Sequence, residues 1–253
     1  MLLASTNEAE LELIYQDVAK EFEITSLGEI RHFLGMEMRR ENEMYQVRLK
    51  QYIDKLLNRH GMDQAKPAKF PMDLGYMKSL QTSKPLDNAH EYRSLVGGLL
   101  YLLVIARPDI AAVTAILGRK FSTPKEADWT AAKRVLRYLK ATKNSYLQLG
   151  GNISEPLAGY SDADWAGDAE SRRSTSGAVF YFGGAAISWT SRRQPCVTLS
   201  SMEAEYVALS EACQETIWLR QLLRDFGETQ IEPTVIKEEN QGCLVFVRTE
   251  RSS

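Results

Sequence analysis

The chain has 253 residues, of which 44% are hydrophobic and 25% charged, and its formal net charge is −2. This ordinary globular composition excludes a disordered tail, a collagen-like chain and a small disulfide-rich protein, and it leaves room for one large domain or two smaller ones. No apolar run is long enough to span a membrane, so we expect no membrane partner. Three widely spaced cysteines indicate a reducing compartment.

Charge is divided unevenly along the chain. Residues 1–150 carry 22 Lys and Arg against 18 Asp and Glu, whereas residues 151–253 carry 9 against 15. The most basic part is 78–143, with 12 basic and 5 acidic residues. This division is typical of a protein that holds a polyanion with one part and gathers metal-binding carboxylates in another. The alternative is that the basic residues form an ordinary solvated helix face.

Hydrophobic periodicity predicts a helix and a hairpin in the first part of the chain, followed by a proline-rich segment. In chain order we expect a helix over 7–22 with Thr6 as its N-cap, strands over 30–38 and 44–49 around a polar turn at 39–43, a short helix over 49–59 that ends at Gly61, and a linker or extended crossing over 62–90.

The next stretch, 88–143, is predicted to be helical. The segment 91–105 is apolar nearly all round and should be buried, and Pro108 and Pro124 are placed to open the next two helices, over 109–121 and 125–140. On the last of these helices an apolar stripe is expected to face inward, formed by Trp129, Ala132, Val135, Leu136 and Leu139. The opposite side carries Lys133, Arg134, Arg137 and Lys140.

The third stretch, 145–253, alternates between strand and helix patterns, which predicts a mixed sheet with helices packed on it. In chain order we expect strands over 146–149 and 156–165, a hairpin of 177–182 and 185–190 around Gly183 and Gly184, a short strand over 197–199, a long helix over 201–226 that ends at Gly227, a strand over 233–237, and a helix from Asn240.

Acidic residues in the segment 161–168 are the strongest local signal for chemistry. On a strand, Asp162 and Asp164 point to one face and their neighbours to the other. Two carboxylates on a buried face are costly without a cation or hydrogen-bond donors; the alternative is a sheet edge with both acids in water. For Asp168, which follows a glycine and begins a polar loop, we expect the solvated position.

The helix after Ser200 carries two glutamates whose positions distinguish them. Ser200 and Glu203 have the spacing of a capping box, so Glu203 is expected to bind the helix start. Glu205 instead shares an apolar stripe with Ala208 and later residues at three- and four-residue spacing. That stripe should face the sheet, where an ionised Glu205 needs a partner such as a metal shared with Asp162.

A third acid, Glu239, lies at the carboxyl end of the last predicted strand, where sites usually lie in α/β sheets, although acids near helix starts are also common caps. Asp162, Glu205 and Glu239 are hard oxygen ligands that suit Mg²⁺ or Mn²⁺. Two such ions can clamp the attacking water and the leaving oxygen in phosphodiester hydrolysis. A Ser-His-Asp site is excluded because no histidine follows residue 90.

Several long motifs in this order resemble the Pol polyproteins of copia-type LTR retrotransposons. Four segments resemble the ribonuclease H region of these polyproteins: residues 159–168 (GYSDADWAGD), 173–177 (RSTSG), 187–189 (ISW) and 199–206 (LSSMEAEY). Four others resemble the reverse transcriptase region: residues 33–36 (FLGM), 92–97 (YRSLVG), 106–110 (ARPDI) and 133–140 (KRVLRYLK). The match covers nearly the whole chain.

The resemblance implies three parts: the end of a reverse transcriptase palm with a primer-grip-like hairpin (1–76), a helical thumb or connection (77–144), and a ribonuclease H-like mixed α/β domain (145–253). In this family, carboxylates bind two Mg²⁺ ions that cut the RNA strand of an RNA–DNA hybrid. By motif the ligands are Asp162, Glu205 and Glu239, the last where the family usually has Asp. We expect the family's last catalytic Asp to lie beyond residue 253 and its polymerase carboxylates to precede residue 1. Weak or no cleavage by this chain alone is therefore expected, and the alternative is a silent, degenerate transposon fragment that at most binds nucleic acid.

The expected partners are an RNA–DNA hybrid and the remainder of the polyprotein, in an intracellular particle or the nucleus. The helical part should contact phosphates through Lys133, Arg134, Arg137 and Lys140, which would position the hybrid without reading its sequence. Arg172 and Arg173, beside the acidic strand, either hold the substrate near the metals or lie in a solvated turn.

Overall fold

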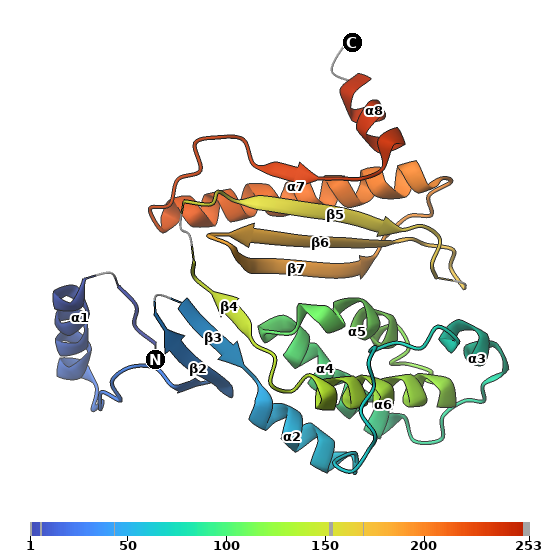
Figure 1. Cartoon of the computed structure of the whole chain (residues 1–253), viewed down its shortest axis with the longest axis horizontal. Helices are drawn as coiled ribbons and strands as arrows, with labels where there is room; N and C mark the ends of the chain where they lie inside the picture. The colour runs from blue at the N-terminus through green and yellow to red at the C-terminus, as the bar shows by residue number, and fades with distance from the viewer. Residues whose placement is uncertain (1, 6, 43, 152–153, 169, 250–253) are drawn as a thin grey trace.

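The computed structural model describes residues 2–5, 7–42, 44–151, 154–168 and 170–249. The fold is mixed α/β, with two four-stranded sheets and α-helices packed on them. In Figure 1 the second sheet and its long helix lie above a helical unit, and the first sheet lies beside that helical unit. No helix in these ranges is long and apolar enough to cross a membrane.

Helix α1 (Glu8–Glu21) stands at the surface beside the first sheet (Figure 1). Its N-cap is Asn7, whose Oδ1 accepts a hydrogen bond from the Ala9 N–H at 3.0 Å. This bond satisfies one of the first-turn N–H groups that have no partner within the helix. The predicted cap, Thr6, lies outside the described residues. Although the apolar spacing predicted the helix correctly, none of its residues is buried.

The first sheet has the order β1-β2-β3-β4, and every pair is antiparallel. Its strands are β1 (His32–Phe33), β2 (Met36–Glu41), β3 (Met44–Arg48) and β4 (Leu147–Leu149). The predicted hairpin is confirmed, although residues 39–41, expected in its turn, belong to β2, and the strand expected over 30–38 is divided between β1 and β2. Asn42 is in the left-handed region at φ 57°. The strand expected over 146–149 was assigned to the third stretch, but it pairs with β3 and completes the first sheet.

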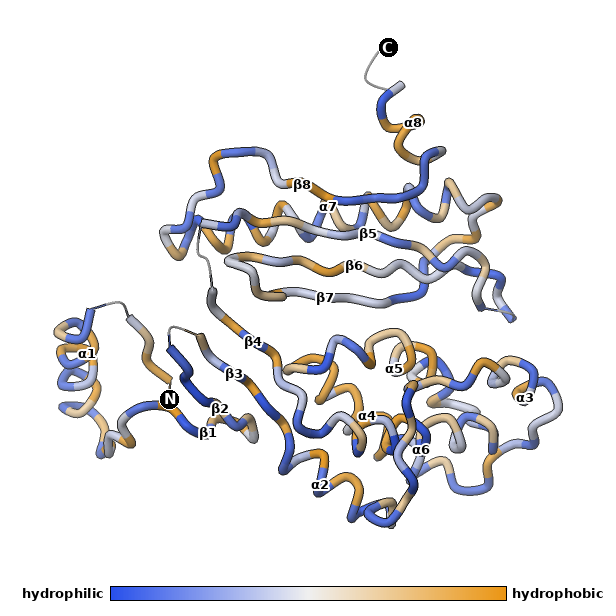
Figure 2. Tube along the Cα trace, viewed as in Figure 1, coloured by the Kyte–Doolittle hydropathy of each residue, from blue (hydrophilic) through white to orange (hydrophobic). Residues whose placement is uncertain are grey.

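The helical unit consists of α2 (Lys50–Arg59), α3 (Tyr76–Thr82), α4 (Ala89–Ile105), the 3₁₀ turn η1 (Pro108–Ile110), α5 (Ala111–Gly118) and α6 (Glu126–Ala141). Hydrophobic residues gather along α4 and α5 (Figure 2), as the apolar sequence of 91–105 predicted. Helix α3 was not predicted, since its short sequence lies within the proline-rich segment. It is fixed by Tyr76, whose buried hydroxyl donates to Asp128 Oδ1 at 2.6 Å.

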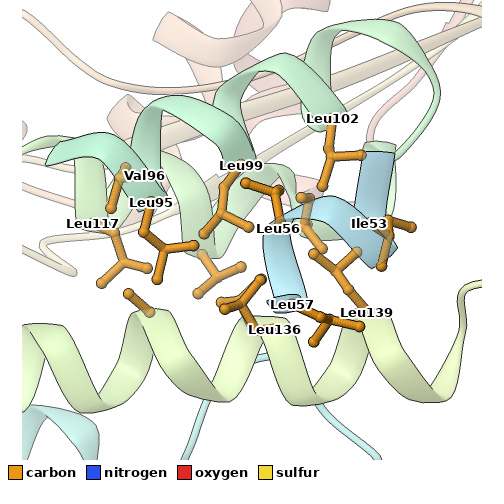
Figure 3. Close-up of a cluster of buried hydrophobic side chains, with 14 of the residues drawn as sticks. Ile53, Leu56, Leu57, Leu95, Val96, Leu99, Leu102, Leu117, Leu136 and Leu139 are labelled. Atoms are coloured by element: carbon orange, nitrogen blue, oxygen red, sulfur yellow. The ribbon is translucent and has the colours of Figure 1, made fainter. Parts of the chain in front are cut away.

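One hydrophobic core joins these helices to the first sheet. Figure 3 shows side chains from α2, α4, α5 and α6 meeting between the helices. The labelled members are Ile53, Leu56, Leu57, Leu95, Val96, Leu99, Leu102, Leu117, Leu136 and Leu139. Full burial of each such side chain contributes about 1.5–3 kcal/mol, so this core stabilises the part of the chain from β3 to α6 as one unit.

The second sheet has the order β7-β6-β5-β8, in which β5 and β8 are parallel and the other pairs are antiparallel. Its strands are β5 (Ala158–Asp164), β6 (Thr175–Phe182), β7 (Ala185–Arg193) and β8 (Val235–Lys237). The predicted turn at Gly183 and Gly184 is confirmed, because both have positive φ. The strand predicted over 197–199 is wrong: that segment forms no strand.

Helix α7 (Ser201–Asp225) covers one face of this sheet, and α8 (Gln241–Thr249) follows β8 (Figure 1). The small core between α7 and the sheet contains Leu157, Phe180, Ala212, Leu219 and Leu223. The predicted capping box of α7 is confirmed in part: Ser200 Oγ accepts from the Glu203 N–H at 3.2 Å, but the Glu203 carboxylate accepts at 2.7 Å from the N–H of Leu199, the residue before the N-cap, and not from that of Ser200.

The second sheet contacts the helical unit through polar bonds. Trp189 Nε1 on β7 donates to the Leu103 carbonyl of α4 at 2.8 Å. Arg119, just after α5, donates to Thr175 Oγ1 at 3.0 Å at the start of β6. These bonds fix the edge of the second sheet against α4 and α5.

Candidate functional site

The acidic residues of β5 lie on its exposed face. Burial alternates along the strand, with Ser161 buried and Asp162 and Asp164 exposed, as the strand period predicted. The Asp164 carboxylate packs over Gly167, where an added Cβ would lie 1.9 Å from Asp164 Oδ2. Glycine at position 167 therefore allows the chain to turn tightly beneath this carboxylate.

Glu205 is a buried acid on the face of α7 that packs on the sheet. Its side chain lies on the stripe with Ala208 and Ala212, as its spacing predicted, and only 7% of the residue is exposed. Burial, followed by the charges of Glu238 and Asp162, raises the pKa of Glu205 to about 7, although the Ala163 N–H donates to its carboxylate. Its Oε2 is buried and has no hydrogen-bond partner in the described structure.

The acid that β8 brings to the α7 side of the sheet is Glu238. Along β8 and its continuation the half-buried positions alternate with exposed ones, which places Glu238 on the inner side with Ile236 and leaves Glu239 exposed. Glu238 Oε1 accepts from the Asn240 N–H at 2.9 Å, and its Oε2 is buried without a partner in the described part of the chain.

The pKa of Glu238 is raised by burial and by the nearby charges of Asp162 and Glu239, against the opposing effect of backbone N–H donors. Sequence reasoning selected Glu239, whereas counting the strand alternation from half-buried Ile236 identifies Glu238 as the inward-facing acid. Asp162, Glu205 and Glu238 thus form a group of acids whose charges influence one another.

This carboxylate group has the donor chemistry that a hard divalent cation requires. Glu205 and Glu238 each carry a buried, unpartnered oxygen, and a cation would satisfy both of them. As the side chains stand, however, no three His, Cys, Asp or Glu among the described residues are arranged so that they could hold a metal ion together. Exposed Asp162 must therefore reorient before it can share a cation with Glu205 and Glu238.

The basic side chains of α6 bind a neighbouring segment of the chain. Arg134 forms an ion pair with Asp73 at 2.9 Å, Arg137 Nε donates to the Lys66 carbonyl at 2.6 Å, and Lys140 Nζ donates to the Ala65 carbonyl at 3.0 Å. We call residues 62–75 the strap, since these bonds hold them against α6. Three of the four predicted phosphate contacts are thereby engaged within the chain.

The fourth predicted contact, Lys133, lies over the ring of Trp129, with its Nζ 5.3 Å from the ring centroid. This cation–π contact leaves the ammonium group without an ion-pair partner among the residues that the structure describes. Lys133 is therefore the member of this set whose charged group makes no bond to the strap among the described residues.

Arg172 and Arg173 lie in the loop between β5 and β6. Arg172 is exposed and has a left-handed backbone at φ 55°, and within the described ranges neither guanidinium has a hydrogen-bond or ion-pair partner. Both are therefore available to an anion beside the acidic strand, although their side chains are not held in place.

Asp168, expected in water, is instead half-buried and ion-paired, and it anchors this loop. Its side chain is 11% exposed, and its Oδ2 lies 2.9 Å from Arg193 and 3.9 Å from Arg119. Despite the opposing effect of burial, these contacts and the N–H groups of Ser171 and Glu170 lower the pKa of Asp168 to about 2. The expectation of a solvated acid was wrong because Arg119 and Arg193 are distant in the sequence and no local pattern indicates their contact with Asp168.

Comparisons with known proteins identify relatives for most of the chain. Residues 1–74 match the family model described as reverse transcriptase (RNA-dependent DNA polymerase). The chain is 38% identical over 245 residues to the retrovirus-related Pol polyprotein from transposon TNT 1-94 of Nicotiana tabacum, which covers 93% of this chain and 18% of that protein. It is 36% identical over 245 residues to the corresponding polyprotein from transposon RE1 of Arabidopsis thaliana, covering 96% and 16%.

A shorter relative is the secreted RxLR effector protein 161 of Plasmopara viticola, 52% identical over 128 residues, which are 51% of this chain and 90% of that protein. No solved structure matches the chain. The chain spans less than a fifth of the length of the two Pol polyproteins named above.

Proposed function

Because the chain belongs to the copia-type retrovirus-related Pol polyproteins, we propose that its C-terminal part is a ribonuclease H-type nuclease that hydrolyses the RNA strand of an RNA–DNA hybrid during reverse transcription. The observation that carries this proposal is the group of acids at the second sheet, in which Glu205 on α7 and Glu238 just after β8 each have a buried, unpartnered carboxylate oxygen and the charge of Glu238 raises the pKa of Glu205. Such an arrangement is costly in the absence of a cation.

The proposal extends to the three parts of the chain. Residues 1–76 are the end of a polymerase palm, 77–144 a thumb or connection, and 145–253 the nuclease domain. The strand order β7-β6-β5-β8, with α7 on one face, supports a ribonuclease H-like sheet. The proposed partners are the hybrid and the remainder of the polyprotein, in an intracellular particle or the nucleus.

In this mechanism Asp162, Glu205 and Glu238 hold the divalent cations, with exposed Glu239 as a further oxygen ligand from the same strand end. Bound Mg²⁺ or Mn²⁺ would supply an activated water and stabilise the leaving oxygen. Glu205 must release its proton before it can bind a cation, because its raised pKa leaves it partly protonated near neutral pH.

The hybrid would be held by basic side chains near these acids. Arg172 and Arg173 are free to meet phosphates beside β5, and Lys133 offers a further positive charge on α6. Arg134, Arg137 and Lys140 would contribute the N–H groups that their bonds to the strap leave free. These contacts would weaken with increasing salt.

The second candidate is a catalytically silent fragment that only binds nucleic acid. It is favoured by one observation: within the described ranges no three metal-ligating side chains are arranged for a shared ion. A silent fragment would retain salt-dependent affinity for a hybrid while losing cation binding at the acids.

The two functions are separated by measuring cleavage and cation binding on the same protein. A labelled RNA–DNA hybrid is incubated with the purified chain and Mg²⁺ or Mn²⁺, and Mn²⁺ binding is followed by electron paramagnetic resonance. Cleavage and saturable Mn²⁺ binding that are both lost in Asp162→Asn, but kept in the exposed control Glu228→Gln, support the nuclease. Salt-dependent hybrid binding without either property supports the silent fragment.

A further inference from the structure

The loop between β5 and β6 lies where the second sheet meets the helical unit. It begins directly after Asp164 and carries Arg172 and Arg173 beside the acidic strand. Ala166 and Arg172 are in the left-handed backbone region, at φ 53° and 55°, a conformation that costs energy in residues other than glycine. A loop with this backbone depends on contacts that hold it in shape.

Asp168 holds the backbone of both loop arginines. Its N–H donates to the Arg173 carbonyl at 3.2 Å, and its carbonyl accepts from the Arg172 N–H at 2.7 Å. Its Oδ1 also accepts from the N–H groups of Glu170 and Ser171, at 3.1 and 3.2 Å. The positions of Arg172 and Arg173 therefore depend on where Asp168 is fixed.

The helical unit contributes a guanidinium group that fixes Asp168. Arg119, the C-cap of α5, places one nitrogen 3.9 Å from Asp168 Oδ2, and another of its nitrogens donates to Thr175 Oγ1 at 3.0 Å. Thr175 is the first residue of β6, so a single side chain contacts both the loop and the strand that follows it. Arg193 on β7 lies 2.9 Å from the same carboxylate oxygen and holds it from within the sheet.

Arg119 is the more important of two contacts that the helical unit makes with this loop. The side chains of Arg119 and Asp168 are only 15% and 11% exposed, so solvent screens their charges little. Lys120 lies 2.9 Å from the Glu170 carboxylate, but the Glu170 side chain is 70% exposed, and ion pairs at the surface contribute little. Burial lowers the pKa of Arg119, and the charges of Asp168 and Asp164 oppose this effect, which places Arg119 within the field of the acidic strand as well.

We propose that Arg119 is a positioning residue for a nucleic acid bound at the acids. From the helical unit it holds Asp168, and through Asp168 it keeps Arg172 and Arg173 beside β5, where they meet the phosphates of the hybrid. The inference rests on the hybrid binding of the proposed function and not on cleavage. It gives the helical unit a part in the substrate site even where its own lysines and arginines do not reach the hybrid.

A purely structural role for Arg119 would be to dock the second sheet on the helical unit. The Trp189 Nε1 bond to the Leu103 carbonyl joins the same two parts of the chain at a different point. Trp189→Phe removes this bond and leaves Arg119 and Asp168 in place. It therefore serves as a matched control, because it weakens the docking without releasing the loop.

The test measures binding of a fluorescently labelled RNA–DNA hybrid by anisotropy, without a divalent cation so that no cleavage intervenes. We expect Arg119→Gln to weaken binding about two- to fivefold, as the loss of exposed phosphate contacts would. The same change should have no further effect in a chain that already carries Arg172→Gln and Arg173→Gln, because its effect passes through those side chains. Trp189→Phe should leave the contribution of the two loop arginines intact.

Amide hydrogen exchange reports on the loop itself. The amides of 170–172 bond to Asp168, so they should exchange faster in Arg119→Gln than in the unaltered chain and at an unchanged rate in Trp189→Phe. Thr175→Val removes the hydrogen-bond acceptor of Arg119 without changing any charge. It should shift both measurements in the same direction, and it replaces Arg119→Gln if the unfolding midpoint shows that this variant does not fold.

An equal loss of affinity on Arg119→Gln with and without the two loop arginines would overturn the proposal, and so would unchanged exchange of the loop amides. Absence of hybrid binding by the unaltered chain would overturn it too, because the loop would then have nothing to position. Hybrid binding without cleavage would instead refute the nuclease, and the same affinity measurements would still decide the role of Arg119.

Discussion

Replacement of Glu205 by Gln should stabilise the protein at alkaline pH. The pKa of Glu205 rises from 4.5 to about 7 in the folded chain, which corresponds to at most about 3 kcal/mol of destabilisation once the carboxylate is fully ionised. Between these two values the folded state binds more protons than the unfolded state, so the free energy of unfolding falls as pH rises from about 4.5 to 7. Glutamine keeps the shape of the side chain and removes this ionisation.

The assay is urea unfolding of the unaltered chain, Glu205→Gln and the exposed control Glu228→Gln at several pH values. Tryptophan fluorescence reports on the relevant part, because Trp165 directly follows β5, Trp189 lies in β7 and Trp218 lies on α7. We expect Glu205→Gln to gain about 1–3 kcal/mol over the unaltered chain at pH 8. The gain should shrink toward zero at pH 4.5, and the control should show no pH-dependent gain.

An equal free energy of unfolding for Glu205→Gln and the unaltered chain at pH 8 would refute this reasoning. A difference that stayed constant between pH 4.5 and 8 would refute it as well, because a packing effect of the amide does not titrate. Either result would mean that the carboxylate is not held against the charges of the neighbouring acids.

Three further perturbations test other parts of the structure. Asp168→Asn should lower the free energy of unfolding by about 2 kcal/mol at pH 7, because the ion pair with Arg193 is lost. In thermal unfolding, the difference from the unaltered chain should vanish as pH falls from about 4 toward 2. A difference that persisted at pH 2 would contradict the ion-pair account. Leu136→Ala should cost about 2–5 kcal/mol in urea unfolding because its side chain is fully buried, and a loss below about 1 kcal/mol would contradict that burial. Arg137→Ala should speed proteolytic cleavage within the strap, 62–75, relative to the unaltered chain, whereas unchanged cleavage would show that the strap is held by other contacts.

The helices and the hairpins were predictable from local pattern, and the partners of isolated polar groups were not. Hydrophobic periodicity predicted the bounds of α4 and α6 within a few residues, because a long apolar face can be recognised in the sequence even when the segment it packs against is unknown. The short strand over 197–199 failed because its apolar residues do not pair; Thr198 instead accepts from Trp165 Nε1 through its carbonyl. Short apolar runs do not specify whether a neighbouring strand is available.

The candidate site was predicted in part for the same reason. Glu205 could be assigned to the buried side of α7 because the helical stripe contains several residues. The choice between Glu238 and Glu239 depended on where β8 ends and which face it buries, and the motif alignment favoured the exposed residue.

The pairing of β3 with β4 has a consequence for how the protein is made. Val47 lies opposite Leu147, so one edge of β3 stays open until about 100 more residues have left the ribosome, roughly 5–20 s at ordinary elongation rates. During that interval an unpaired strand edge is exposed to neighbouring nascent chains. Completion of the first sheet is therefore delayed until β4 has been synthesised, and a pause in translation before residue 149 would prolong the period in which the growing polypeptide is prone to aggregate.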